Sequence, residues 1–177
     1  DGTLKQRTAW INNNKVEMVI ELHLDSAPGA SGCTLFYYDG FTNVRDAGKP
    51  LLDTYSQYSG IKSRGMKPDS STRHGRLGII RDTKPTAYLL ELGFIQNDLE
   101  TVRQKAAVAL AQGILKYLNK PLMTEIQLAD WEKVALDYAS KAIKFDTKEP
   151  RKAMTRVEVA ETMRKFEAYI ASKYSLK

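Results

Sequence analysis

Residues 84–100, KPTAYLLELGFIQNDLE, contain the pattern that decides the fold. An apolar run from Thr86 to Leu92 predicts a buried strand, and the chain leaves it at Leu92-Gly93-Phe94. Asn97 and Glu100 then have capping-box spacing, which predicts a helix to about Leu118. A strand that leads directly into a helix is typical of α/β proteins. Together with the helix and strand alternation over residues 1–118, this predicts an α/β fold with a mainly parallel twisted sheet flanked by helices.

The remaining elements follow from apolar periodicity and from turn residues. We expect strands at Val16–Leu24, Thr34–Tyr38 and Leu77–Arg81, helices at Leu4–Asn14 and Val44–Ser59, and a long loop over residues 62–76.

Two residues that can carry chemistry fall at strand ends. The stretch VIELHLDS, residues 19–26, places His23 near the end of one strand, and Glu91 lies near the end of another. Ligands collect beyond the carboxyl ends of parallel strands. A carboxylate in apolar surroundings suits a general base, and an imidazole suits a metal ion, so the pair indicates a metal-assisted hydrolase. Taken singly, a lone histidine at a strand end is more often a hydrogen-bonded structural residue than a ligand, and an isolated glutamate there is as often a salt-bridge partner.

Composition narrows the class of protein. The 177 residues carry a formal net charge of +6 and a pI near 9.3, which favours polyanionic surroundings such as nucleic acid, an anionic cell wall or a membrane surface. The basic residues are scattered and no nucleic-acid-binding motif is present, so nucleic acid is not the expected partner. The single Cys33 excludes an internal disulfide and a cysteine metal cluster. No continuous apolar stretch is long enough to span a membrane.

Beyond Pro121 the pattern becomes purely helical. Two amphipathic helices with a short connection predict a helical hairpin over residues 124–177, packed separately from a domain at residues 1–119.

Three motifs also resemble a known family. VIELHLDS, SGCTLFYYDG (31–40) and RLGIIRDTKPTAYLLELGFIQNDLE (76–100) resemble the zinc-dependent N-acetylmuramoyl-L-alanine amidases of bacterial autolysins and phage endolysins. The opening DGTLKQRTAWINNN is similar to the helix that precedes the histidine strand in that family. The similarity covers roughly residues 1–118 and is most specific in its last motif.

The resemblance implies a function and site residues. By it, His23 is a zinc ligand and Glu91 the catalytic glutamate that cleaves the amide between N-acetylmuramic acid and L-alanine in peptidoglycan. Glu21, Asp25, Ser26 and Arg73 are expected in the substrate groove. Glu21 stands where the family has a small residue, and either orients His23 or is an ordinary surface charge.

The sequence departs from the family pattern in its metal ligands. A first histidine, in an Asp-Pro-Gly-His-Gly-Gly type loop, and a glutamate shortly after it precede the corresponding helix in the family, and this sequence has neither. One ligand of three cannot hold catalytic zinc. Either the natural protein extends further towards its N-terminus, which we expect, or this sequence cannot bind zinc by itself.

The hairpin more faintly resembles a surface-layer homology module, through Trp131, Ala135 and MTRVEVAETM (154–163). That resemblance implies binding to anionic wall polymers, and a hairpin that packs or forms a homodimer is the alternative. The expected location is the bacterial cell wall or the extracellular space, or the host cytoplasm before lysis for a phage endolysin. The rival function is a non-catalytic wall-binding module.

Overall fold

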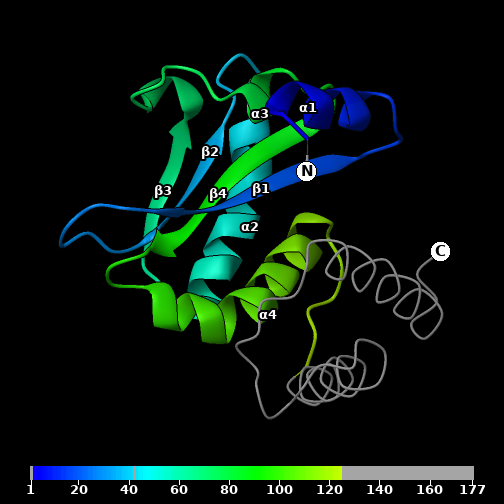
Figure 1. The fold of residues 1–177 in the computed structure, drawn as a ribbon. Coiled ribbons are helices and arrows are strands. Elements are labelled where there is room, and N and C mark those ends of the chain that lie inside the picture. Colours follow the sequence, from blue (N-terminus) through cyan, green and yellow to red (C-terminus); the bar gives the residue numbers. More distant parts are fainter. Residues whose placement is uncertain (1, 42, 125–177) are drawn as a thin grey trace, which may run out of the picture. The chain divides into compact units, whose positions relative to one another are not determined.

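The computed structural model describes residues 2–41 and 43–124. Its strands and helices are interspersed along the chain (Figure 1). The strands are β1 (Met18–Asp25), β2 (Cys33–Tyr37), β3 (Ser63–Pro68) and β4 (Thr86–Phe94). The helices are α1 (Leu4–Asn12), α2 (Val44–Ser59), the 3₁₀ turn η1 (Asp69–Ser71), α3 (Gly78–Arg81) and α4 (Leu99–Tyr117).

The four strands form one sheet in the order β1-β4-β2-β3. β4 pairs in parallel with β1 and antiparallel with β2, whereas β2 and β3 are parallel. The α/β class is therefore confirmed, but the sheet is mixed rather than purely parallel. The reason lies in the connection between β3 and β4: η1 and α3 turn the chain back, so β4 enters the sheet opposite in direction to β2 and β3.

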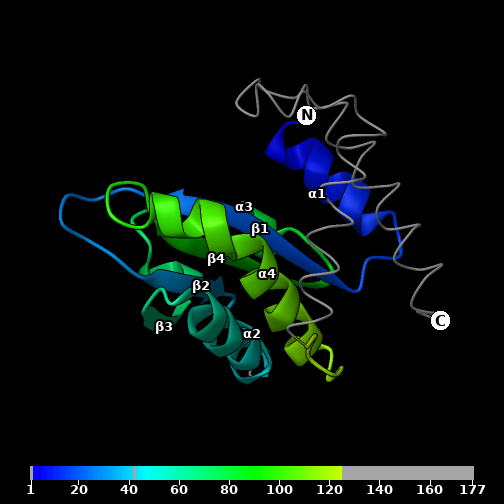
Figure 2. The same cartoon turned by 90° about the horizontal axis from the view of Figure 1, so that it is seen from below.

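Helices cover both faces of this sheet, with α2 and α4 on one face and α1 and α3 on the other (Figures 1 and 2). The α2–α4 side holds the main core, in which Leu51, Leu52 and Tyr55 of α2 pack on strand residues such as Leu35 and Leu90. The two helices approach closely, because a Cβ at Gly113 would lie 2.8 Å from the carbonyl oxygen of Leu51. Apolar burial of this extent is the dominant stabilising contribution.

A smaller cluster lies on the α1–α3 face. Ile79 and Ile80 of α3 pack with Leu89 of β4, and Ile11 and Val19 lie against them. This is the face that also carries His23 and Glu91, since alternate residues of a strand point to the same side.

Two sequence predictions fail between residues 62 and 81. Leu77–Arg81, predicted as a strand, contains α3, because Ile79 and Ile80 fit onto Leu89 as a single helical turn. Part of the predicted 62–76 loop is the strand β3, whose half-buried residues lack polar and apolar alternation. Pairing with β2 supplies the order that the local sequence does not indicate.

By its internal contacts the chain separates into two units, Asp1–Leu122 and Met123–Lys177. The predicted hairpin at 124–177 lies outside the described residues, apart from Thr124. Within the described part, no helix is both long enough and apolar enough to cross a membrane.

Candidate active site

His23 and Glu91 are direct neighbours across two parallel strands. They are register partners of β1 and β4, as are Glu21 and Leu89 two residues earlier. Partners in register project their side chains to the same face of a sheet. The register shifts immediately afterwards, between His23 and Asp25, so the pair lies at the last regular position before the two strands end. The two strand ends predicted to carry chemistry therefore meet.

Glu91 combines burial with an unused hydrogen-bonding atom. Its Oε2 is buried and has no hydrogen-bond partner. Burial raises the pKa of Glu91 above its ordinary value, nearby His23 acts in the opposite direction, and Asp25 raises it further. Buried polar atoms are almost always paired in native proteins, so this oxygen is available to bind a ligand or a proton.

Glu21 shares the face of His23 and links it to α1. Its Oε1 accepts a hydrogen bond from Nη1 of Arg7 at 2.6 Å and lies 3.7 Å from Nε2 of His23. An open pocket of about 550 Å³ adjoins these three side chains. Its lining consists of Arg7, Ile11, Val19, Ile20, Glu21, Leu22, His23 and Ile79.

Asp25 and Ser26 connect the end of β1 to the loop after β4. Oδ1 of Asp25 accepts from the backbone N–H of Ser26 at 2.7 Å. The hydroxyl of Ser26 accepts from Nε2 of Gln96 at 2.7 Å, and the N–H of Ile95 donates to the carbonyl of Asp25. The loops that follow the two strands are thus joined next to Glu91. Nothing in the sequence indicates this contact of Gln96, because its partner is 70 residues away.

Asp98 also binds the loop before β2 to the end of β4, and the sequence did not predict this role. Its buried carboxylate accepts from the hydroxyl of Ser31 at 2.6 Å, and from the backbone N–H groups of Gly32 and Phe94, both at 2.9 Å. Burial works to raise the pKa of Asp98, but these hydrogen bonds bring it below its ordinary value.

The predicted capping box at Asn97 and Glu100 is wrong. Asp98 is the N-cap residue of α4 and makes no side-chain cap bond. Asn97 donates instead to the carbonyl of Ala30 at 2.7 Å.

Arg73 lies apart from the other predicted site residues. It follows η1, and its Nε donates to Nε2 of His74 at 3.2 Å. β2 begins next to Glu91, where Thr34 is the partner of that residue. β3 runs in the same direction and ends at Pro68, beside Tyr37. The loop that carries Arg73 therefore starts towards the opposite end of the sheet from His23.

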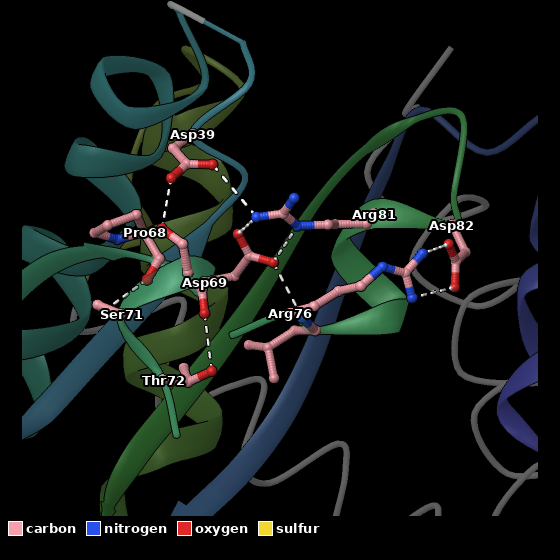
Figure 3. A network of polar contacts seen from close by, with 10 residues as sticks. Asp39, Pro68, Asp69, Ser71, Thr72, Arg76, Arg81 and Asp82 are labelled. Atoms are coloured by element: carbon pink, nitrogen blue, oxygen red, sulfur yellow. Dashed lines mark hydrogen bonds and ion pairs between the residues drawn. The ribbon is translucent and has the colours of Figure 1, made fainter. Parts of the chain in front are cut away.

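An ion-pair network fixes this distant loop (Figure 3). The fully buried carboxylate of Asp69 accepts from Nε of Arg81 at 2.6 Å and from the N–H of Leu77 at 3.0 Å. The guanidinium of Arg81 also lies over the ring of Tyr38 and reaches Asp39 at 3.4 Å. This network holds α3, and with it Ile79 of the pocket lining, against the sheet.

Comparison with known proteins assigns the family. A family model described as N-acetylmuramoyl-L-alanine amidase matches residues 1–120, which is more than half of the chain. The chain belongs to the N-acetylmuramoyl-L-alanine amidase family. A search of curated protein sequences gave no significant match.

Solved amidase structures share the fold. An N-acetylmuramoyl-L-alanine amidase from Clostridium difficile 630 matches with a TM-score of 0.57 and 21% identity, over 67% of this chain and 66% of its own. The catalytic domain of the CD27L endolysin, described as targeting Clostridia Difficile, gives 0.56 and 25%, over 68% and 64%. The catalytic domain of the amidase CwlV from Bacillus (Paenibacillus) polymyxa gives 0.50 and 26%, over 68% of each chain. The chain thus spans about two thirds of the length of these structures.

His23 and Glu91 have the chemistry of part of a zinc site. The imidazole of His23 is a suitable zinc ligand, and the unpaired Oε2 of Glu91 lies beside it. Among residues 2–41 and 43–124, however, no group of three histidine, cysteine, aspartate or glutamate side chains could hold a metal ion. The described part of the chain therefore offers one candidate ligand, His23, and a neighbouring carboxylate, Glu91.

Proposed function

We propose that this amidase cleaves peptidoglycan at the amide bond between the lactyl group of N-acetylmuramic acid and L-alanine. The observation that carries the proposal is the pairing of His23 with Glu91 at the ends of β1 and β4, with one buried glutamate oxygen left without a partner. Membership of the family supports the assignment over the rival wall-binding module without activity.

In this proposal His23 is one ligand of a zinc ion. The other ligands come from outside the described residues, since these supply no three-residue group. Bound zinc would supply a Lewis acid that polarises the carbonyl of the scissile amide.

Glu91 moves the proton. Its carboxylate accepts a proton from the attacking water while oxygen bonds to the amide carbon, and it gives that proton to the nitrogen as the carbon–nitrogen bond breaks. The products are a lactyl carboxylic acid and the free amino group of L-alanine. Burial raises the pKa of Glu91, which makes it a stronger base than an exposed glutamate and a usable acid in the second half of the reaction.

The surrounding residues define where substrate lies. Glu21, Asp25 and Ser26 border the pair and would contact the muramic acid or the peptide. Arg73 starts from the other end of the sheet, so it touches substrate only if a long glycan strand extends over the η1–α3 loop. We place the enzyme at the bacterial cell wall or outside the cell, or in the host cytoplasm before lysis if it comes from a phage.

The predicted hairpin is proposed to bind anionic wall polymers, with dimer formation as its alternative. Sedimentation with purified walls, before and after removal of their anionic polymers, distinguishes the two.

Product analysis tests the proposed reaction. The full-length natural protein is incubated with zinc and purified bacterial walls, and new amino groups and new reducing sugar ends are measured. An amidase releases the amino group of L-alanine and no reducing ends, loses this activity with a chelator, and regains it with zinc. His23→Ala removes the activity. A full-length protein that sediments with walls but releases no amino groups is a wall-binding module instead.

A further inference from the structure

Arg7 and Glu21 form an ion pair at the edge of the candidate site. Nη1 of Arg7 lies 2.6 Å from Oε1 of Glu21, and the two side chains are 47% and 16% exposed. The residues come from α1 and β1 and are 14 positions apart. Both line the pocket beside His23. The glutamate is thus a largely buried carboxylate fixed by a guanidinium from another element.

Arg7 has a defined position because α1 is attached at both ends. Near its start, Leu4 contacts α3 so closely that a Cβ at Gly78 would lie 2.5 Å from a Leu4 methyl carbon. At its end, Asn12 donates to the carbonyl of Asp82 at 2.7 Å and accepts from the N–H of Lys84 at 2.6 Å. The guanidinium therefore approaches Glu21 from a helix that cannot shift freely along the sheet.

Glu21 in turn faces one particular nitrogen of His23. Its Oε1 is 3.7 Å from Nε2, which is within ion-pair range but longer than a hydrogen bond. The side chain of His23 is 47% exposed, so the imidazole has room to rotate towards Glu21. Catalytic hydrogen bonds are often long in the absence of substrate and metal.

We propose that Arg7 and Glu21 are positioning residues for His23: Arg7 fixes the Glu21 carboxylate, which accepts the Nε2–H of the imidazole and leaves the Nδ1 lone pair free. Which nitrogen of a histidine binds a metal is set by the hydrogen bond that the other nitrogen makes. Histidine ligands commonly donate their second N–H to a carboxylate for this reason. Nδ1 of His23 is then the atom presented to an electrophile.

This inference rests on the proposed function, because the orientation of His23 matters only if His23 binds a metal ion. Its test, however, needs neither zinc nor enzymatic activity. The tautomer of His23 is read from long-range ¹H–¹⁵N spectra of the full chain at about pH 9, well above the ordinary histidine pKa of about 6.5. The chain has two histidines, so a His74→Gln variant assigns both signals. His74 accepts from Arg73 at its Nε2 and provides a reference with the opposite tautomer.

The expected result is a single Nε2–H form for His23 in the unmodified chain. Glu21→Leu and Arg7→Gln each convert it to the mixture of both forms that an unrestrained imidazole shows. Arg103→Gln, which removes an exposed arginine paired with Glu100 on α4, is the matched control and leaves His23 unchanged. Unchanged thermal melting temperatures in the variants separate positioning from loss of fold.

Three results overturn the proposal: an Nδ1–H form of His23 in the unmodified chain, a mixture already present there, or a tautomer that neither substitution alters. None of them bears on whether walls are cleaved, so failure here is distinguishable from failure of the proposed function.

Discussion

The carboxylate of Asp98, at the N-terminus of α4, accepts a hydrogen bond from the backbone N–H of Gly32, which precedes β2 by one residue. The same carboxylate accepts from Ser31 and Phe94. Two donors from the loop before β2 and one from the last residue of β4 thus converge on one buried side chain. This contact places the chain after β4, and with it the end of the strand that carries Glu91.

Asp98→Asn is expected to lower the free energy of unfolding by about 1–3 kcal/mol at neutral pH, because an amide has one acceptor oxygen where the carboxylate uses two. Urea denaturation measures the loss. Asp53→Asn, which breaks an exposed pair with Lys49 on α2, is the control and should cost less than about 1 kcal/mol.

The effect of Asp98 also has a defined pH dependence. The pKa of Asp98 is lowered by folding from an ordinary value of 3.8. Its stabilisation is therefore complete above 3.8 and is lost as the pH falls through the folded-state pKa. The stability difference between the unmodified chain and Asp98→Asn should shrink below pH 3.8, and a difference that grows on acidification would contradict this account.

Two aspartate–arginine pairs near α3 allow a second comparison (Figure 3). Asp69 is fully buried beneath Arg81, whereas Arg76 and Asp82 are 54% and 40% exposed. Asp69→Asn should destabilise the fold by about 3 kcal/mol, because it leaves buried donors and a guanidinium without their charge partner. Asp82→Asn should cost no more than about 1 kcal/mol. Equal losses in urea denaturation would show that burial of the pair does not matter.

The charged carboxylate of Glu91 is expected to lower the free energy of unfolding. Because its pKa is raised in the fold, the charged form is disfavoured by folding, and this cost applies above the folded-state pKa and vanishes below the unfolded one. Glu91→Gln in the zinc-free chain should therefore raise the free energy of unfolding at pH 7 by about 1 kcal/mol. The gain should disappear near pH 4, and a loss of stability at pH 7 would contradict the expected penalty.

Local patterns were sufficient for the elements that carry His23 and Glu91. The apolar run of β4 and the alternation in β1 come from burial that each strand experiences by itself, and the predicted ends meet in register. Gly60 ends α2 in the left-handed conformation, directly after the predicted helix Val44–Ser59.

Long-range contacts explain what was missed. The polar segment of β3 becomes a strand through pairing with β2, and α3 forms because Ile79 and Ile80 dock onto Leu89. The burial of Asp98 and Asp69 could not be predicted either, since aspartates before a helix or in a polar loop are ordinarily exposed. The partners of Asp98 include Gly32, which is far away in the sequence. The partner of Asp69 is Arg81 of α3, which folds back onto η1.

The central claim is that Glu91 transfers the proton in amide cleavage beside His23. The most direct measurement is the rate of amino-group release from purified walls by Glu91→Gln, together with its zinc content and its binding to walls. The account predicts a turnover lowered by about 10²–10⁴-fold, the usual contribution of a general acid–base group, with zinc content and wall binding unchanged and with Glu100→Gln, an exposed glutamate of α4, fully active. A Glu91→Gln variant that cleaves walls at the unmodified rate would contradict it.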